Sequence, residues 1–200
     1  KEAVSSSQIE GTQSSLADLL EAESSIHRPE HPDDIEDVSN YVAALNLGLG
    51  QVANGPFSTE AMLRIHERLM RGQTAHDPNP GHLRSVQNWI GRKGCTVETA
   101  SFVPPPPHEV PLLLDALFGF LRRSGSLPPL VKIGLAHAQF ETIHPFRDGN
   151  GRVGRLLVTL LLSEYKILKH PLLLLSSYLR ENRSEYYSRL QDTRDRGDWE

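Results

Sequence analysis

Hydrophobic residues recur at helical spacing along most of the chain. Between residues 33 and 50 they follow one another at steps of three and four behind an acidic first turn, which predicts a helix with one apolar face. The same spacing predicts shorter helices over residues 15–20 and 58–72, the second of them capped by Ser58. It returns in the second half of the chain at residues 110–121, 130–143, 151–165, 172–179 and 183–194.

Residues 73–107 depart from this spacing. They are rich in Gly, Pro, Asn and His, and they contain two short runs of β-formers at residues 86–90 and 100–103. These runs predict a two-stranded hairpin, which must lie against helices because an isolated hairpin is only marginally stable. The prolines at 104–107 form a stiff spacer. The expected fold class is therefore all-α with one β-hairpin.

Composition narrows the class of protein without assigning a function. The 200 residues fit one ordinary domain, and contents of 38% apolar and 23% charged residues are typical of a soluble globular protein. A formal charge of −4 gives no overall field that would attract nucleic acid or an anionic membrane, so we expect neither as a partner. Any anionic ligand must then be held by a local site.

The cysteine content and the apolar stretches bear on the compartment. Cys95 is the single cysteine, so no intrachain disulfide can form. The most apolar stretch, residues 156–175, is interrupted by Glu164, Lys166 and Lys169, which excludes a membrane span there. Both features favour a cytoplasmic protein. The chain starts without a methionine and stops without an ending signal, so we expect a fragment that lacks a further C-terminal domain.

Residues 144–155 form the densest group of chemically useful side chains, His-Pro-Phe-Arg-Asp-Gly-Asn-Gly-Arg-Val-Gly-Arg. Within this segment, residues 149–154 match the dinucleotide-binding pattern G-x-G-x-x-G. That pattern requires a preceding strand and an acidic residue about 20 positions later. Here the preceding segment is predicted to be helical, and no acidic residue occurs between Glu164 and Glu181. The dinucleotide interpretation is therefore excluded.

A turn that enters a helix explains the segment better. Residues 149–151 favour tight backbone turns, and the amides at the start of the next helix form an anion cradle. Arg152 and Arg155 lie on the same side of that helix, where both can reach phosphate oxygens. Asp148 suits Mg²⁺, which takes its other ligands from phosphates and water, and His144 suits a general base. Each feature alone is more often structural, but their combination favours a phosphate-handling site.

This segment resembles the signature of the Fic family, His-Pro-Phe-x-Asp/Asn-Gly-Asn-Gly-Arg-x-x-Arg, at every fixed position. The resemblance implies the Fic fold, a helical domain of about eight helices with a small β-hairpin flap. It also implies transfer of AMP from ATP to a Ser, Thr or Tyr hydroxyl of a target protein, with release of pyrophosphate. In domain terms, residues 1–30 would hold an inhibitory helix and a short following helix, and residues 31–200 would form the catalytic domain.

The resemblance also implies a role for each motif residue. His144 would be the general base, and Asp148 would hold Mg²⁺ between the α- and β-phosphates. Arg152 would neutralise the leaving pyrophosphate, and Arg155 would hold the γ-phosphate. Residues 182–187 resemble the part of the family that lines the nucleotide base, with core packing of Tyr186 as the competing explanation. The expected nucleotide-binding set is Gly149, Asn150, Gly151, Arg152, Gly154, Arg155 and Tyr187.

Two further segments resemble parts of the family. Ser6-Ser7-Gln8-Ile9-Glu10-Gly11 fits the inhibitory pattern Ser/Thr-x-x-x-Glu-Gly/Asn, in which Glu10 would pair with Arg155 and exclude the γ-phosphate. A capped N-terminal turn is the alternative. Residues 86–103 resemble the flap that docks the target by strand addition, and a purely structural hairpin is the alternative. The expected docking edge is Ala100, Ser101 and Phe102.

Alternative functions use the same site. Glu10 could instead align a water molecule that removes AMP from a modified protein, or the chain could sense ATP without any chemistry. Some Fic relatives transfer phosphate or phosphocholine, although the unbroken Gly-Asn-Gly-Arg-x-x-Arg is closer to the adenylylating pattern. The expected partner is a protein substrate of unknown identity. Self-modification and a homodimer stay open.

Overall fold

The computed structural model describes residues 1–13, 15–23, 32–73, 77–92, 94–168, 170, 173–197 and 199. Most of these residues are helical, and none of the described helices is long and apolar enough to cross a membrane. Two short 3₁₀ turns, η1 (Val97–Thr99) and η2 (Pro107–Glu109), precede α5. The α-helices are α1 (Glu2–Ile9), α2 (Leu16–Glu23), α3 (Pro32–Asn54), α4 (Thr59–Leu69), α5 (Val110–Arg122), α6 (Pro129–Ile143), α7 (Asn150–Glu164), α8 (Leu175–Glu181) and α9 (Arg183–Arg196).

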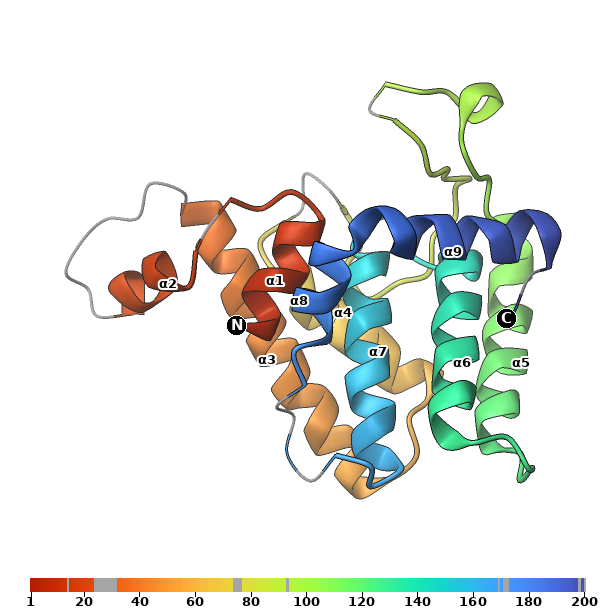
Figure 1. Ribbon diagram of the computed structural model, residues 1–200. Helices are drawn as coiled ribbons and strands as arrows, with labels where there is room; N and C mark the ends of the chain where they lie inside the picture. Colours follow the sequence, from red (N-terminus) through yellow and green to blue (C-terminus); the bar gives the residue numbers. More distant parts are fainter. Residues whose placement is uncertain are drawn as a thin grey trace.

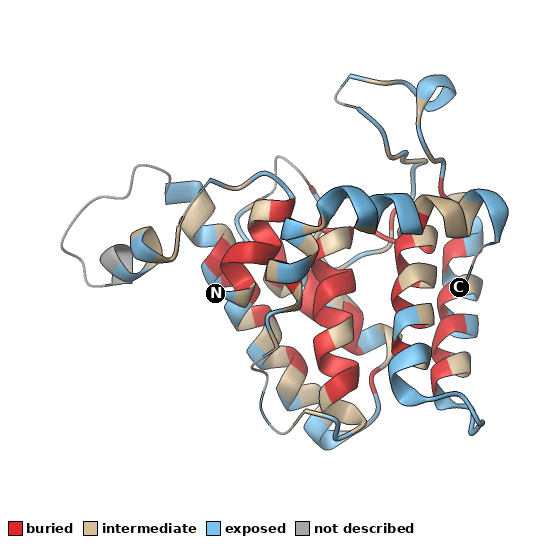
Figure 2. Cartoon of the chain, viewed as in Figure 1, coloured by how far each residue is buried: buried red, intermediate tan, exposed pale blue. Residues whose placement is uncertain are grey.

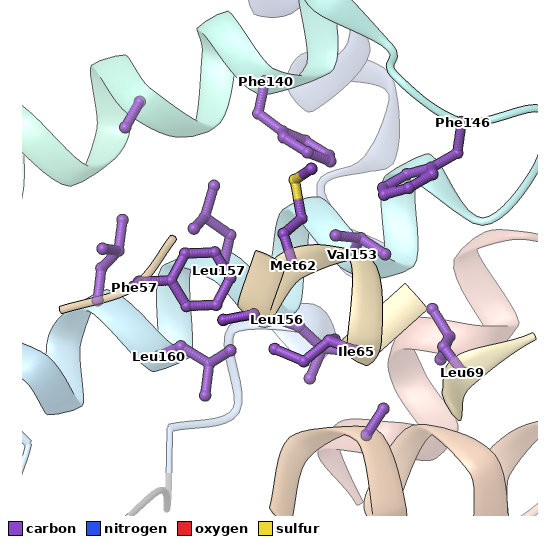
Figure 3. Packing of buried hydrophobic residues seen from close by; sticks show 14 of the residues in the cluster. Phe57, Met62, Ile65, Leu69, Phe140, Phe146, Val153, Leu156, Leu157 and Leu160 are labelled. Carbon is purple, nitrogen blue, oxygen red and sulfur yellow. The ribbon is translucent and has the colours of Figure 1, made fainter. Parts of the chain in front are cut away.

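Helix α7 lies at the centre of the molecule. Its neighbours are α3, α4, α1 and α6, and α5 packs on the far side of α6 (Figure 1). Most of its residues are buried, and they include Asn150, Arg152 and Arg155 as well as the apolar positions. Its buried residues meet Phe140 of α6, Phe146 of the following loop and Met62 of α4 (Figure 3). This packing fixes the start of α7, which carries residues 150–155 of the motif.

The predicted helices are confirmed, with small differences at their ends. Helix α3 runs from Pro32 to Asn54, and the Ser58 hydroxyl accepts a hydrogen bond from the Ala61 amide at 3.2 Å, as a helix N-cap should. The helix expected from residue 172 begins at Leu175, since residues 173–174 are not helical, and residues 171–172 lie outside the described part of the chain. The fold class is therefore confirmed as all-α.

The two predicted strands are much shorter than residues 86–90 and 100–103. Over the described part of this segment, only one isolated antiparallel bridge forms, between Ile90 and Phe102. Figure 2 shows the segment, hereafter the flap (residues 86–103), exposed on most of its surface. A longer ladder needs an apolar face that packs against the domain, and in this projecting segment Val86, Trp89 and Val103 stay exposed. The flap is thus a minimal hairpin on a helical domain.

Helix α1 is docked along α8 by polar pairs at three successive positions. The Glu2 carboxylate accepts a hydrogen bond from the Ser176 amide at 3.0 Å, and the Ser5 and Ser177 hydroxyls lie 2.9 Å apart. Gln8 accepts a hydrogen bond from Arg180. Ile9, at the end of α1, is fully buried. The N-terminal segment is thus a packed part of the molecule, and the division at residues 1–30 and 31–200 stays a prediction.

Candidate functional site

The loop between α6 and α7 is closed by its own side chains. Asn150, at the first position of α7, accepts a hydrogen bond from the Phe146 amide at 2.8 Å and donates to the Phe146 carbonyl at 2.9 Å. Asn150 is buried, and Phe146 is fully buried against α4. Both polar atoms of the Asn150 side chain therefore hold the loop in place, so its predicted contact with phosphate must compete with this structural role.

Two residues that sequence reasoning missed hold the same loop from outside. The His66 imidazole is fully buried and stacks on the Phe146 ring at 3.7 Å. The Gly81 amide donates to His66 Nδ1 at 2.9 Å, which leaves the proton on Nε2, 3.1 Å from the Asp148 carbonyl. Arg84 donates from Nε to the His144 carbonyl at 2.8 Å. A histidine on the apolar face of α4 was the only sequence signal for this support.

Gly149 makes the entry into α7 possible. Its φ is +75°, in the left-handed region, and a Cβ there would lie 2.7 Å from Met70 Sδ. We expect Gly149→Ala to lower the free energy of unfolding by about 1–3 kcal/mol, because strain and overlap add. Thermal unfolding of the variant and the parent measures this change in the free energy of unfolding. Gly50→Ala on α3, where a Cβ meets nothing within 4 Å, is the matched control and should not destabilise. Equal melting temperatures for both variants would contradict this account.

His144 ends α6 in a left-handed conformation with φ of 50°. Its Nδ1 lies 3.3 Å from the Glu141 carbonyl, and since a carbonyl only accepts, Nδ1 is the protonated nitrogen. Burial lowers the pKa of His144 to about 4. The ring is therefore neutral near pH 7, and its Nε2 is the atom that can accept a proton.

Arg155 is held by α1. Its guanidinium is almost fully buried and donates from Nε to the Ser6 hydroxyl at 2.9 Å and from Nη2 to the Ser6 carbonyl at 3.0 Å. The same Nη2 lies 2.8 Å from Glu10 Oε1 in a salt bridge. Glu10 follows the last turn of α1 and keeps 40% of its side chain exposed. The structure thus brings the predicted inhibitory residues onto Arg155.

Arg152 reaches toward α3 and the end of α4. Its Nη2 donates to Gln73 Oε1 at 3.2 Å and to Met70 Sδ at 3.3 Å. Its Nη1 lies 3.7 Å from an Asp37 carboxylate oxygen. The two motif arginines therefore engage different partners.

Two cavities meet at Glu10. The smaller, of about 280 Å³, is lined by His144, Gly151, Arg155 and Tyr187 among others. The larger, of about 560 Å³, is lined by Asp148 and Arg152 together with carboxylates of α3. Glu10 lines both cavities, and a Cβ at Gly151 would overlap the Glu10 carboxylate. His144 and Arg155 thus lie on one side of Glu10, and Asp148 and Arg152 lie on the other.

Asp148 fits the requirements of a nucleotide-bound Mg²⁺ better than those of a metal held by protein alone. One of its carboxylate oxygens accepts a hydrogen bond from the Gly149 amide at 2.5 Å. Over the described chain, no group of three or more His, Cys, Asp or Glu side chains could hold a metal ion. A single carboxylate suffices for Mg²⁺ when phosphates and water complete its shell.

Gly154 lies between α6 and α7, and Tyr186 and Tyr187 lie beside the smaller cavity. Gly154 faces α6, where a Cβ would overlap the Glu141 carboxylate, so its position indicates close helix packing rather than the predicted nucleotide contact. Tyr186 and Tyr187 both line the smaller cavity, and the contact of Tyr187 with the nucleotide base stays a prediction. The hydroxyl of Tyr186 lies 2.9 Å from Nε2 of the buried His137, which agrees with the alternative of core packing for this residue.

The flap presents a different edge to the cavity from the one that the sequence suggested. The amides of Ser101 and Phe102 donate to the Ile90 carbonyl at 2.8 and 3.1 Å, and the Ser101 carbonyl accepts from Gln191 at 3.2 Å. Residues 89–91 line the smaller cavity beside His144. The expected edge at 100–102 is thus turned toward Ile90 and α9.

Glu141 is a buried acid at the junction of α6 and α7. Among the described residues its Oε1 has no hydrogen-bond partner, and burial raises its pKa to about 7. The folded state therefore keeps a proton on Glu141 that the unfolded chain has lost by pH 7. Ionisation of this acid lowers stability as the pH rises from about 4.5 to 7.

We therefore expect Glu141→Gln to gain stability relative to the parent as the pH rises. The gain between pH 5 and pH 8 should be on the order of 2 kcal/mol, because only the parent must bury a charge at the higher pH. Melting temperatures of both chains across this range measure the difference. A difference that stays constant between pH 5 and pH 8 would mean that the Glu141 carboxyl group is not perturbed.

Family models match most of the chain. Residues 56–162 match the model described as Fic/DOC family, and residues 1–50 match the model described as Fic/DOC family N-terminal. The first match includes the whole motif at 144–155, and the second includes Glu10 and α1.

Two relatives found by sequence similarity agree with these family matches. The chain is 32% identical over 135 residues to a probable protein adenylyltransferase of Aquifex aeolicus, covering 68% of this chain and 36% of the relative. It is 29% identical over 148 residues to the protein adenylyltransferase Fic-1 of Caenorhabditis elegans, covering 73% of this chain and 26% of that protein. The chain therefore spans about a third or less of the length of these relatives.

Solved structures confirm the fold. A Fic family protein from Desulfovibrio desulfuricans matches 99% of this chain and 58% of its own chain with a TM-score of 0.83 at 29% identity. The Fic-1 structure from Caenorhabditis elegans matches 97% of this chain and 54% of its own, with a TM-score of 0.73 at 25% identity.

Proposed function

Because the chain belongs to the Fic/DOC family, we propose that it is a protein adenylyltransferase that moves AMP from ATP to a hydroxyl side chain of a target protein. The names of its relatives support this class of reaction. The observation that carries the proposal is the pair of cavities that meet at Glu10. Together these cavities are lined by His144, by Gly151 at the start of α7 and by both motif arginines, which supports a site for a triphosphate.

In the proposed reaction, His144 acts as the general base. Its Nε2 takes the proton of the target hydroxyl while that oxygen forms a bond to the α-phosphorus of ATP. The bond from the α-phosphorus to the bridging oxygen breaks, and pyrophosphate leaves with the electron pair. The amides of Asn150 and Gly151, with Arg152 and Arg155, would stabilise the negative charge that develops on the leaving group. Mg²⁺ held by Asp148 would supply further neutralisation of the phosphates.

Glu10 is proposed to restrain this activity. Its carboxylate lies on the Arg155 guanidinium at 2.8 Å, which is the donor that a γ-phosphate would use. A triphosphate cannot take the same bonds while α1 remains docked. The parent chain should therefore bind ATP without aligning it well for transfer.

The target segment is proposed to dock along residues 89–91 instead of residues 100–102. Residues 89–91 line the cavity that contains His144, and because the Ile90 backbone is bonded to residues 101–102, an added strand would pair with Trp89 and Gly91. An extended segment added at this edge would bring its hydroxyl side chain toward the imidazole.

Position-specific labelling of ATP tests the reaction type. The Glu10→Gly chain is incubated with Mg²⁺, a protein extract and ATP labelled on either the α- or the γ-phosphate. We expect protein labelling, of the extract or of the chain itself, from the α-label only. Labelling from the γ-phosphate would identify a kinase instead, and ATP binding without any labelling would contradict transferase activity.

Removal of AMP is a second candidate, because Glu10 lines both cavities and keeps 40% of its side chain exposed. A carboxylate in that position can align a water molecule for attack on a protein-linked AMP. Proteins labelled by the Glu10→Gly chain serve as substrates for this test. Release of AMP by the parent, but not by Glu10→Gly, would favour this direction of reaction.

A further inference from the structure

Arg194 joins three parts of the site that lie far apart in the sequence. It lies in the last turn of α9, which crosses the end of α6 (Figure 1). Its Nη2 donates to the Glu141 carbonyl at 2.9 Å, and its guanidinium lies over the Phe102 ring of the flap, 4.2 Å from the ring centre. It also lines the smaller cavity with His144. No motif or pattern in the sequence assigns Arg194 a role.

The Glu141 carbonyl connects Arg194 to His144. This carbonyl faces His144 Nδ1 at 3.3 Å as well as the Arg194 guanidinium. The carboxyl end of a helix attracts positive charge, and a histidine in that position tends to become protonated. Here Arg194 supplies a permanent positive charge at the end of α6. The imidazole can then remain neutral, with its proton on Nδ1 and Nε2 open to the substrate.

Besides Arg194, the groups that shift the pKa of His144 are Arg84, Glu10 and the Glu141 carbonyl. Burial has the largest effect and lowers the pKa of His144, and Arg194 and Arg84 act in the same direction. Glu10, after α1, and the hydrogen bond to the Glu141 carbonyl act in the opposite direction. Among these groups, Arg84 donates to the Val86 carbonyl at the start of the flap at 3.5 Å, and Arg194 covers the Phe102 ring in its second half.

Two successive turns of α9 hold the flap. Gln191 donates to the Ser101 carbonyl at 3.2 Å, and Arg194 covers Phe102 one turn later. Phe102 pairs in turn with Ile90, whose amide donates to the Phe102 carbonyl at 2.8 Å. Ile90 lines the cavity that contains His144. Arg194 therefore lies on a continuous path of contacts from the flap edge to the catalytic base.

We propose that Arg194 is a positioning residue that caps the end of α6, keeps His144 in its neutral Nδ1-protonated form and holds the flap in register with it. The inference rests on the proposed role of His144 as the base. It concerns the resting chain, so it can be tested without nucleotide or target. Its failure is thus distinguishable from a failure of the adenylyltransferase proposal.

The test uses the chain labelled with ¹⁵N, in which the imidazole nitrogens report both the tautomer and the protonation state. The His144→Ala spectrum identifies the His144 signals. In Arg194→Met we expect the pKa of His144 to rise by about one unit, because a neighbouring positive charge is lost. We also expect hydrogen exchange at the Ile90 and Phe102 amides to become about tenfold faster. Chemical shifts elsewhere show whether the variant is folded.

Two variants separate the effects of Arg194. Arg194→Lys keeps the charge, so the His144 titration should stay close to that of the parent while the flap amides exchange faster. Arg189→Met, on an exposed part of α9, is the matched control. It should change neither the His144 titration nor the hydrogen exchange of the flap amides. If Arg194→Met leaves the titration and tautomer of His144 unchanged in a folded chain, Arg194 does not position the base. Unchanged exchange at Ile90 and Phe102 would equally overturn the proposed link to the flap.

Discussion

Replacing His144 with Ala in the Glu10→Gly chain is expected to reduce the rate of AMP transfer by about 10²- to 10⁴-fold, the usual contribution of a general base. The base matters here because burial keeps the pKa of His144 at about 4, so the ring is ready to accept a proton at neutral pH. ATP affinity should change little, since the phosphate groups are expected to contact the α7 amides and the arginines. Initial rates with α-labelled ATP, and binding by calorimetry, measure the two quantities.

The matched control for this loss is His108→Ala. His108 lies in η2 with 80% of its side chain exposed, and its nearest charged group is Glu109. Its removal should leave the rate within about twofold, as for a surface substitution away from the site. Retention of more than a tenth of the rate in His144→Ala would mean that another group takes the proton. A parallel loss of ATP binding would mean that the loop had lost its shape.

Glu10→Gly is expected to raise the initial rate of AMP transfer by about 10- to 100-fold over the parent. The parent must break a charge-assisted bond to Arg155 before a γ-phosphate can bind there, and such bonds are worth about 1.5–3 kcal/mol. The Arg155 side chain is almost fully buried but Glu10 keeps 40% of its side chain exposed, so solvent screens part of the pair and the lower end of this range applies. The measurement compares rates at equal protein and ATP concentrations.

Glu10→Gln provides the graded control for this gain. The amide keeps the size of the side chain and one acceptor oxygen, but it loses the charge, so its rate should fall between the parent and Glu10→Gly. Equal rates in all three chains would show that Glu10 does not restrain transfer. A loss of AMP release in both variants, with no gain in labelling, would favour the hydrolase direction instead.

The helices and the motif were predictable because their signals are local. Apolar residues three and four positions apart predicted α3 to α7, and Gly149 and Gly151 mark the turn that enters α7. The predicted strand lengths were wrong for a tertiary reason, because the flap projects from the domain and buries neither of its faces. Gly154 shows a similar limit, because only the packed structure shows that its missing side chain makes room for Glu141.

The supporting residues could not be predicted from the sequence. His66 lies 82 positions from Asp148, and Arg194 lies 53 positions from Glu141. Neither residue belongs to a recognisable pattern, and each acquires its role only when two helices pack together. Asn150 illustrates the same difficulty within the motif, since an amide beside a phosphate cradle can bind the ligand or hold the loop. The structure shows that it holds the loop.

The contacts along α1 bear on how the proposed restraint by Glu10 would be released. Glu2, Ser5 and Gln8 are three residues apart and bind α8 at successive turns, and Ser6 and Glu10 hold Arg155 on the other side. A short helix anchored along its full length does not melt gradually from one end, because no single turn carries the attachment. We therefore infer that α1 leaves in a cooperative step. Activity across a population of molecules would then reflect the fraction released, with each molecule either restrained or active.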